Sequence, residues 1–371
     1  MELNGEKKVE FIELVYDLIF VYLIGRNASL LDRLEGGFIT TETFVNYLIC
    51  SLIIIQIWNY STLFINRFGR NGISDKVMLL VNMFLLYIIG TNIGHGWDMN
   101  YSAFMGAWCL ILLNLALQYL LKLRAAEDES CRKYIRQHIC LLIVQAAYIG
   151  ASILIHTMTG AVIGQWAVFI GIAAIPFLSK IPTNFGHLTE RVMLYVVFTF
   201  GEMIIIVAEY FTNGFSFEAL YFALVSFLIV AGLFFSYGYV YDRLLDRSGE
   251  RSGSAYMLLH VLIILSLSCV TTSMEFMRDP GVSSLSKTLM LVIALLVFFL
   301  CLALTERWSC RQYRMPVRFL LLLAAEFIVF AAAMVLSAGS GGYVTAAIAL
   351  AFVYIQLGTL LLSGRNTLRR E

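Results

Sequence analysis

Charged residues are scarce in this chain. Asp, Glu, Lys and Arg together make up only 14% of its 371 residues, whereas 60% of the residues are hydrophobic. The mean hydropathy is +0.81. A water-soluble protein needs a much more polar surface than this composition can supply. The composition therefore excludes an ordinary soluble protein and indicates an integral membrane protein.

The chain also lacks the short motifs that mark familiar catalytic and metal sites. It contains no G-x-S-x-G, no H-E-x-x-H and no glycine-rich phosphate loop. Its seven cysteines form no C-x-x-C pair, so we expect free thiols and no structural zinc. The net charge of +1, without a continuous basic stripe, gives no reason to expect nucleic acid as a partner. We expect no cofactor. The sequence favours a protein without enzymatic activity, but it leaves an enzyme as an alternative.

Twelve stretches of the sequence are apolar and long enough to cross a bilayer, which takes about 20 residues. They begin near residues 9, 42, 75, 101, 133, 161, 187, 215, 253, 284, 316 and 341. The connections between them are too short to fold as separate domains. We therefore expect an all-α integral membrane protein of about 12 transmembrane helices, in contact with membrane lipids.

The basic residues predict the orientation of these helices. In short loops, Lys and Arg stay on the cytoplasmic side. Here they are concentrated at 7–8, 67–76, 122–136, 180, 243–251, 307–318 and 365–370, and the main exceptions are Arg26, Arg33 and Arg278. The first apolar stretch carries Glu13 and Asp17 and has no small-residue cleavage site, so it does not resemble a removable signal peptide. We expect a multi-pass protein of the cell (plasma) membrane with both termini in the cytoplasm.

The two halves of the chain share a weak internal similarity. A shift of about 177 residues places Glu13 on Glu190, and similar shifts place 58–67 on 234–243 and 78–80 on 257–259. Two halves of six helices each have the same orientation in the membrane, as in one class of transporter folds. We therefore predict two parallel pseudo-repeats within one membrane domain, residues 1–185 and 186–371.

Ionisable residues at helical spacing open the first predicted helix. Glu10, Glu13 and Asp17 lie at positions i, i+3 and i+7 and so project from one face. Three neighbouring carboxylates repel one another, so this face needs cations from another helix or a bound proton. Glu10 fits a solvated helix end. Asp17 lies roughly 12 Å along the helix, too far from water for its short side chain to reach.

The seventh predicted helix opens in a similar way, with His187-Leu188-Thr189-Glu190-Arg191. His187 and Glu190 share a face, and Glu190 and Arg191 offer charges of either sign at the same depth. A histidine beside carboxylates could bind a divalent metal or relay protons, and the sequence leaves the metal unknown. Farther along, Glu202 lies well inside the hydrocarbon, where an ionised carboxylate is costly. Proton binding and release is the most economical hypothesis for Glu202; a structural hydrogen bond between helices is the alternative.

Two aromatic segments end in similar polar pairs, Asn66-Arg67 and Asp242-Arg243. Aromatic residues at a membrane interface commonly serve as anchors, and anchoring explains Trp58, Tyr60, Tyr237, Tyr239 and Tyr241 about as well as substrate binding does. Anchoring explains Asn66 and Asp242 less well, because both precede an arginine in equivalent places. His260 could join this polar layer or form a structural hydrogen bond. Glu326 is isolated and receives no role.

Several of these segments together resemble one known family. They are Glu13-Leu14-Val15-Tyr16-Asp17-Leu18-Ile19-Phe20-Val21, Asn66-Arg67-Phe68, His187-Leu188-Thr189-Glu190-Arg191 and Gly201-Glu202. They are similar, over nearly the full length and in order, to the low temperature requirement A family of bacterial multi-spanning membrane proteins. The resemblance implies a link by name to growth in the cold, without a defined activity. It also implies a polar signature at Glu13, Asp17, Asn66, Arg67, His187, Glu190, Arg191, Glu202 and Asp242. The chain departs from the family at Met203, commonly a serine, and at Phe234 and Phe235, commonly tryptophans.

The function that we favour is a secondary transporter or permease of the bacterial inner membrane, in which buried carboxylates carry a proton. The alternative is a membrane-embedded enzyme that acts on a lipid or lipid-linked substrate at the cytoplasmic side. A sensor without turnover is a third option. The sequence indicates neither the small-molecule or ion substrate nor the oligomeric state. The predicted substrate- or proton-binding residues are Glu13, Asp17, Asn66, Arg67, His187, Glu190, Arg191, Glu202, Asp242 and His260.

Overall fold

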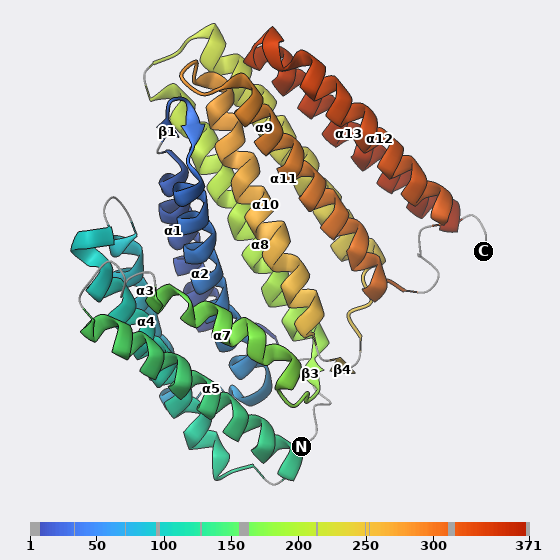
Figure 1. Cartoon of the computed structure of the whole chain (residues 1–371). Coiled ribbons are helices and arrows are strands. Elements are labelled where there is room, and N and C mark those ends of the chain that lie inside the picture. The colour runs from blue at the N-terminus through green and yellow to red at the C-terminus, as the bar shows by residue number, and fades with distance from the viewer. Residues whose placement is uncertain are drawn as a thin grey trace. The chain divides into compact units, whose positions relative to one another are not determined.

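Long apolar helices make up almost all of the part of the chain that the structure describes (Figure 1). The structure is a computed structural model and describes residues 8–32, 34–70, 72–93, 97–126, 128–155, 163–212, 214–248, 250–251, 253–310 and 316–368. Within these residues, 11 helices are long and apolar enough to cross a membrane. Each begins within about four residues of a predicted start. The predicted all-α membrane fold is confirmed.

The remaining predicted helix, near residue 161, corresponds to a shorter apolar helix at Ile163–Phe177. Several basic residues used to predict the orientation lie outside the described residues, namely Lys7, Arg33, Arg311, Arg314, Arg369 and Arg370. The cytoplasmic placement of the termini stays a prediction.

Contacts divide the chain into two compact units. Unit 1 comprises Met1–Leu31, Thr41–Leu194 and Ser248–Ser254, and unit 2 comprises Asp32–Thr40, Tyr195–Arg247 and Ala255–Glu371. The main division falls inside helix α8 (Phe185–Ala208), which gives its first ten residues to unit 1. The predicted repeat of residues 1–185 and 186–371 stays a prediction.

Unit 1 is a bundle of helices joined by short connections. It contains α1 (Phe11–Ala28), α2 (Thr41–Phe68), α3 (Ile73–Asn92), α4 (Trp97–Leu123), α5 (Glu129–Leu154), α7 (Ala167–Ala174) and the start of α8, with β3 (Thr183–Asn184) antiparallel to β4 (Glu250–Arg251). Helix α1 packs against α2 and α3, and α7 packs against α2 and α5. Gly90 of α3 permits a close approach to α1, because a Cβ atom there would overlap the ring of Tyr22.

Three polar side chains hold α7 against α2 and α5. The amide nitrogen of Gln145 donates to Oε1 of Gln56 (3.0 Å) and to the carbonyl oxygen of Ala167 (2.7 Å). Oε1 of Gln145 accepts from the hydroxyl of Tyr60 (3.0 Å). The amide nitrogen of Gln56 donates in turn to the carbonyl oxygen of Val168 (2.9 Å). Gln145 and Gln56 each connect all three helices, and Gln145 takes part in three of the four hydrogen bonds of this network.

We expect Gln145→Leu to lower the free energy of unfolding by about 1–3 kcal/mol, because buried polar groups of Gln56 and Tyr60 lose their partner. The matched control is Gln118→Leu in α4, because Gln118 is also buried but its Nε2 has no hydrogen-bond partner in the described part of the chain. This control should be neutral or stabilising. Unfolding of both variants in detergent micelles provides the measurement, and equal losses would contradict the interpretation.

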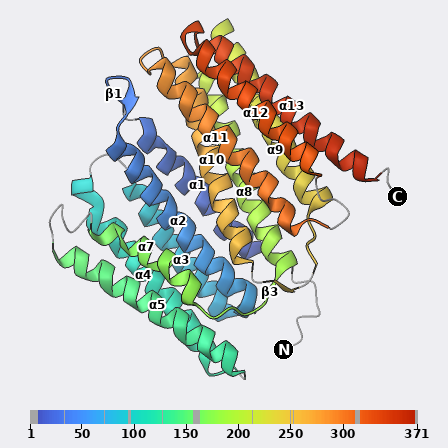
Figure 2. The same cartoon turned by 45° about the vertical axis from the view of Figure 1, so that its right-hand side comes forward.

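Unit 2 is also built from long helices. It contains the rest of α8, α9 (Phe217–Tyr239), α10 (Ser254–Arg278), α11 (Ser284–Leu304), α12 (Val317–Ser337) and α13 (Gly342–Leu368), with the two-stranded pair β1 (Leu34–Glu35) and β2 (Phe38–Ile39). Helices α12 and α13 pack side by side, and both views show this (Figures 1 and 2). Helix α13 packs in turn against α9, and α12 against α11. Helix α9 continues into a π-helical turn at Val240–Leu244.

Short 3-10 turns complete the described secondary structure, at Ser29–Asp32, Ile175–Phe177, Glu209–Phe211, Thr305–Trp308 and Ala338–Ser340.

Candidate functional site

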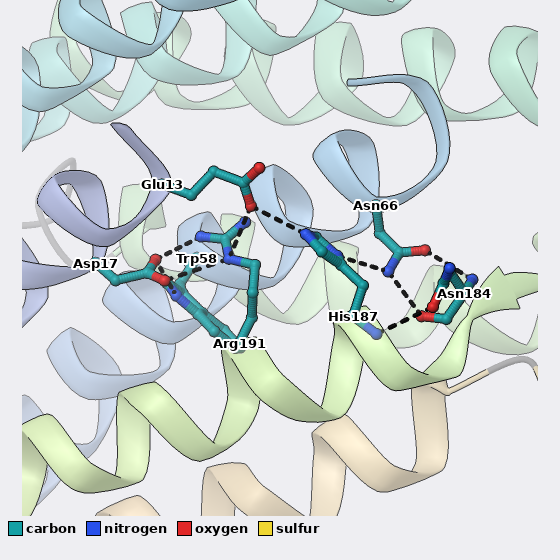
Figure 3. Close-up of polar contacts among 7 residues, drawn as sticks. All are labelled: Glu13, Asp17, Trp58, Asn66, Asn184, His187 and Arg191. Carbon is teal, nitrogen blue, oxygen red and sulfur yellow. Dashed lines mark hydrogen bonds and ion pairs between the residues drawn. The ribbon is translucent and has the colours of Figure 1, made fainter. Parts of the chain in front are cut away.

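Four of the predicted ionisable residues meet in the interior of unit 1 (Figure 3). Glu13 and Asp17 project from α1, and His187 and Arg191 project from α8. Each of the four is at most 1% exposed. The two residues of each helix are one turn apart, so α1 and α8 present matching polar surfaces to each other. We call Glu13, Asp17, His187 and Arg191 the charge cluster.

Asp17 and Arg191 form the strongest pair of the charge cluster. Nη2 of Arg191 lies 2.5 Å from Oδ1 of Asp17, and its Nε lies 3.2 Å from Oδ2. The indole nitrogen of Trp58 in α2 donates a third hydrogen bond to Oδ1 (2.9 Å). The guanidinium carbon of Arg191 also lies 5.8 Å from the centre of the Trp58 ring. A two-pronged contact of this kind satisfies a buried carboxylate and fixes the orientation of both side chains.

Glu13 contacts both His187 and Arg191 of α8 (Figure 3). Its Oε2 is 3.2 Å from Nε2 of His187 and 3.6 Å from Nε of Arg191. The charge cluster thus contains two carboxylates and one permanent cation. Its net charge is −1 when His187 is neutral and zero when His187 is protonated. An uncompensated charge is costly in a buried site. The binding of one proton to His187 therefore removes the net charge of the cluster.

Asn66 of α2 determines which nitrogen of His187 carries the proton. Its Nδ2 donates to the carbonyl oxygen of Asn184 (2.9 Å), and its Oδ1 accepts from the N–H of Asn184 (3.1 Å). These two backbone contacts fix the orientation of the Asn66 amide, since a carbonyl only accepts and an N–H only donates. The same Nδ2 lies 3.0 Å from Nδ1 of His187, which must therefore accept. In this arrangement His187 carries its single proton on Nε2, which lies 3.2 Å from Oε2 of Glu13.

The same contacts tie His187 to the start of α8. Oδ1 of Asn184 accepts from the backbone N–H of His187 (3.0 Å), which is the usual cap of a helix N-terminus. A second proton on His187 would sit on Nδ1 and face the amide hydrogens of Asn66. Two donors cannot share this contact, so protonation requires Asn66 to turn and release Asn184. The arrangement connects the charge of the cluster to the first turn of α8.

The other described histidines have the opposite arrangement. Nδ1 of His138 lies 2.9 Å from the carbonyl oxygen of Tyr134, and Nδ1 of His260 lies 2.8 Å from that of Tyr256. A carbonyl oxygen only accepts, so both histidines carry a proton on Nδ1. Of the three histidines that the structure describes, only His187 contacts a carboxylate. His260 belongs to unit 2 and packs on Tyr256, an arrangement that suits a structural hydrogen bond.

Two predicted residues of unit 1 do not join the charge cluster. Arg67 follows Asn66 on α2, but its guanidinium donates to the hydroxyl of Tyr134 and to the carbonyl oxygen of Ile181 (3.1 Å). Glu190 is half-buried and forms no hydrogen bond or ion pair with any described residue. The exposed Glu10 stands at the N-terminus of α1, as expected for a solvated helix end.

The other predicted residues belong to unit 2. Glu202 is half-buried in α8, and Asp242 is exposed in the π-helical turn. Neither forms a hydrogen bond or an ion pair within the described residues. Their participation in a site, together with that of His260, stays a prediction. Across the described ranges, no group of three or more His, Cys, Asp or Glu side chains is placed to hold a metal ion.

Sequence reasoning missed Trp58 and Asn184. For Trp58 the sequence left interface anchoring and substrate binding open, although Trp58 lies two helical turns before Asn66 and therefore on the same face of α2. This shared face was the signal that could have assigned it to the site. Asn184 is a favoured capping residue three positions before His187, so a search for helix caps would have found it.

Comparisons with known proteins support the family suggested by the sequence. The family model of the bacterial low temperature requirement A protein (LtrA) matches residues 8–354. Neither the curated proteins nor the solved structures give a significant match. The family match covers most of the chain, including both helices that form the charge cluster. The chain therefore belongs to the bacterial low temperature requirement A family.

Proposed function

We propose that this protein is a secondary transporter of the bacterial inner membrane, and that the charge cluster binds and releases the coupling proton. The observation that carries the proposal is the buried set of two carboxylates, one arginine and one histidine. A purely structural ion pair needs only one partner for each charge. Here the number of carboxylates exceeds the number of permanent cations by one, and His187 can supply the missing charge.

The contacts of His187 provide a route from proton binding to movement. When Nδ1 takes up a proton, Asn66 must give up Asn184, and the cap at the start of α8 is altered. Helix α8 is continuous and contributes residues to both units, so a change at its first turn acts on an element that both units share. Glu202, farther along α8, is the second proton-binding group of the proposal.

The proposed topology gives protons access from one side. With the N-terminus in the cytoplasm, Glu13 and His187 lie within the first turn of their helices from the cytoplasmic surface. Asp17 and Arg191 lie one turn deeper, about 6 Å farther along each helix. Protons would therefore enter at Glu13 and His187, and the Asp17–Arg191 pair would separate them from the membrane interior.

Transport in liposomes tests the proposal. The full chain is reconstituted with a pH-sensitive dye inside the vesicles, and gradients of candidate solutes are imposed one at a time. We expect at least one solute to drive proton movement that stops when its gradient is removed. Empty vesicles and vesicles with Arg136→Met, which alters only an exposed ion pair with Glu129, serve as controls. Absence of both solute and proton flux across a broad panel, with correctly inserted protein, would contradict transport.

A further inference from the structure

Glu326 is a carboxyl group near the middle of α12, in unit 2. It is the tenth residue of this 21-residue helix, about 14 Å from the helix start. Helix α12 buries only Phe319, Phe330 and Met334, whereas Ile328 and Val329 are each 68% exposed. In a membrane-spanning helix, such an exposed apolar face meets lipid. The carboxyl group of Glu326 therefore lies at the depth of the bilayer centre, beside a lipid-facing surface.

Among the described residues, the groups that contact this carboxyl group are neutral and belong to α13. The amide nitrogen of Gln356 donates to Oε2 (3.0 Å), and the hydroxyl of Thr359 donates to Oε1 (2.6 Å). The amide nitrogen of Gln356 also donates to the carbonyl oxygen of Leu323 (3.3 Å), which fixes its orientation. Within the described residues, no cation forms an ion pair with Glu326. An ionised carboxylate at this depth would thus lack a counter-charge, which is costly.

No other titratable side chain that the structure describes near α12 contacts Glu326. Those on the described parts of α12 itself and of the helices packed against it are Arg318, Lys287, Cys301, Tyr343 and Tyr354. None of them forms a hydrogen bond or an ion pair with Glu326. Within the described residues, the side chains that contact the carboxyl group of Glu326 are therefore Gln356 and Thr359.

We propose that Glu326 is a proton-binding site in the middle of the α12–α13 hairpin, which holds its proton at neutral pH and exchanges it at higher pH. The contact with Thr359 serves both states, because a hydroxyl can donate and accept. When the carboxylate is ionised, the Thr359 hydroxyl donates to Oε1. When Oε1 carries the proton, it donates to Thr359 across the same 2.6 Å. Gln356 donates to Oε2 in both states, so Glu326 can bind or release the proton while both hydrogen bonds are kept.

A hydrophobic carbodiimide detects such a group, because it dissolves in lipid and reacts with protonated carboxyl groups. The carboxyl oxygen bonds to the central carbon of the carbodiimide, and the proton moves to one of its nitrogens. The O-acylisourea that forms rearranges to a stable N-acylurea, with no leaving group and no oxidant. The adduct stays on the protein and is located by mass spectrometry of peptides. This site does not rest on the transport proposal and is tested without any flux measurement.

The full chain in lipid vesicles is treated with dicyclohexylcarbodiimide between about pH 5 and about pH 9, a range that spans ordinary and strongly displaced carboxyl titrations. We expect an adduct on the peptide that contains Glu326, formed more slowly as the pH rises and absent from Glu326→Gln. The matched control is Glu209→Gln, which removes an exposed carboxyl group in the 3-10 turn that follows α8. This control should leave labelling of Glu326 unchanged, while a water-soluble carbodiimide should label Glu209 in the wild type.

A second variant tests the role of the α13 donors. The hydrogen bond that Thr359 donates to the ionised carboxylate is stronger than the one it accepts from the protonated carboxyl group, so Thr359→Val should favour the protonated form and increase labelling at high pH about fivefold. Infrared difference spectra of wild type and Glu326→Gln should show a protonated carboxyl band that disappears in the variant. Lack of both the adduct and the band would overturn the proposal. So would labelling that does not change with pH, or protection by sodium ions at constant pH, which would assign the site to a metal cation.

Discussion

Arg191→Met will lower the free energy of unfolding by about 3–5 kcal/mol, because it removes the cation that two buried carboxylates share. Asp17 loses its two-pronged contact at 2.5 and 3.2 Å, and Glu13 loses a contact at 3.6 Å. The hydrogen bond from Trp58 remains but carries no charge. Methionine fills a similar volume, so the loss measures the charge more than the packing.

The matched control for this substitution is Arg136→Met. Arg136 and Glu129 also form an Arg–carboxylate pair, at 3.4 Å, but their side chains are 61% and 73% exposed. An exposed pair contributes about 1 kcal/mol or less. Unfolding of both variants is followed in detergent micelles by circular dichroism. If the two arginine substitutions cost the same, the burial of the charge cluster does not determine its contribution.

The double variant Asp17→Leu/Arg191→Met isolates the direct pair. Replacing both partners by apolar residues removes one of the two carboxylates that Arg191→Met leaves without a cation. We expect the double variant to be more stable than Arg191→Met alone, although Glu13 still lacks its cation. The coupling energy between the two sites comes from the complete mutant cycle. Additive effects would show that Asp17 and Arg191 do not act as a pair.

The sequence predicted the number and the starts of the helices well, because their apolar length follows directly from the thickness of a bilayer. One of them is shorter in the described part of the chain than the sequence predicts. The predicted helix near residue 161 is the short helix Ile163–Phe177, whose inner part, α7, is held by side-chain amides of Gln56 and Gln145. Counting apolar residues cannot separate a helix that crosses the membrane from a shorter one that packs inside the bundle.

The sequence also identified the residues of the charge cluster, but it did not predict which of them would pair. Spacing along a helix shows that Glu13 and Asp17 share a face, and it predicted the same for His187 and Glu190. In the structure, His187 and Arg191 face α1, and Glu190 makes no contact with the cluster. Spacing does not show which helices become neighbours or how they rotate about their axes. Those choices depend on packing far apart in the sequence, such as the contact of Trp58 with Asp17.

His187→Gln will reduce proton-coupled flux by about 100-fold or more, the loss that follows removal of a positioned proton-transfer group in an enzyme. Glutamine is polar and similar in length, but it cannot bind a proton near neutral pH. The charge cluster then has a net charge of −1 whenever both of its carboxylates are ionised, and only a carboxylate can bind the proton that would balance it. The matched control is His138→Gln, because His138 is buried in the same unit and contacts no carboxylate. Unchanged flux in His187→Gln would exclude His187 as the proton-binding group.

Nitrogen-15 NMR of labelled histidine tests the protonation state directly. At neutral pH, His187 should carry its proton on Nε2, whereas His138 and His260 should carry theirs on Nδ1. Single histidine-to-glutamine variants assign the signals. A proton on Nδ1 of His187 would contradict the orientation that the backbone of Asn184 imposes on Asn66.

Asn66→Asp separates protonation of His187 from its proposed effect, through Asn66, on the start of α8. A carboxylate at this position accepts a hydrogen bond from a protonated Nδ1 of His187. The amide nitrogen of Asn66 cannot accept one, because it is itself a donor to Nδ1. His187 should therefore be doubly protonated at a pH at which the wild-type side chain is neutral. The bond to the carbonyl oxygen of Asn184 is lost at the same time, because an ionised carboxylate cannot donate. We expect flux to fall as far as in His187→Gln, but with an imidazolium signal in the NMR spectrum instead of no signal. If Asn66→Asp keeps both wild-type flux and a neutral His187, proton binding does not act through Asn66 on the start of α8.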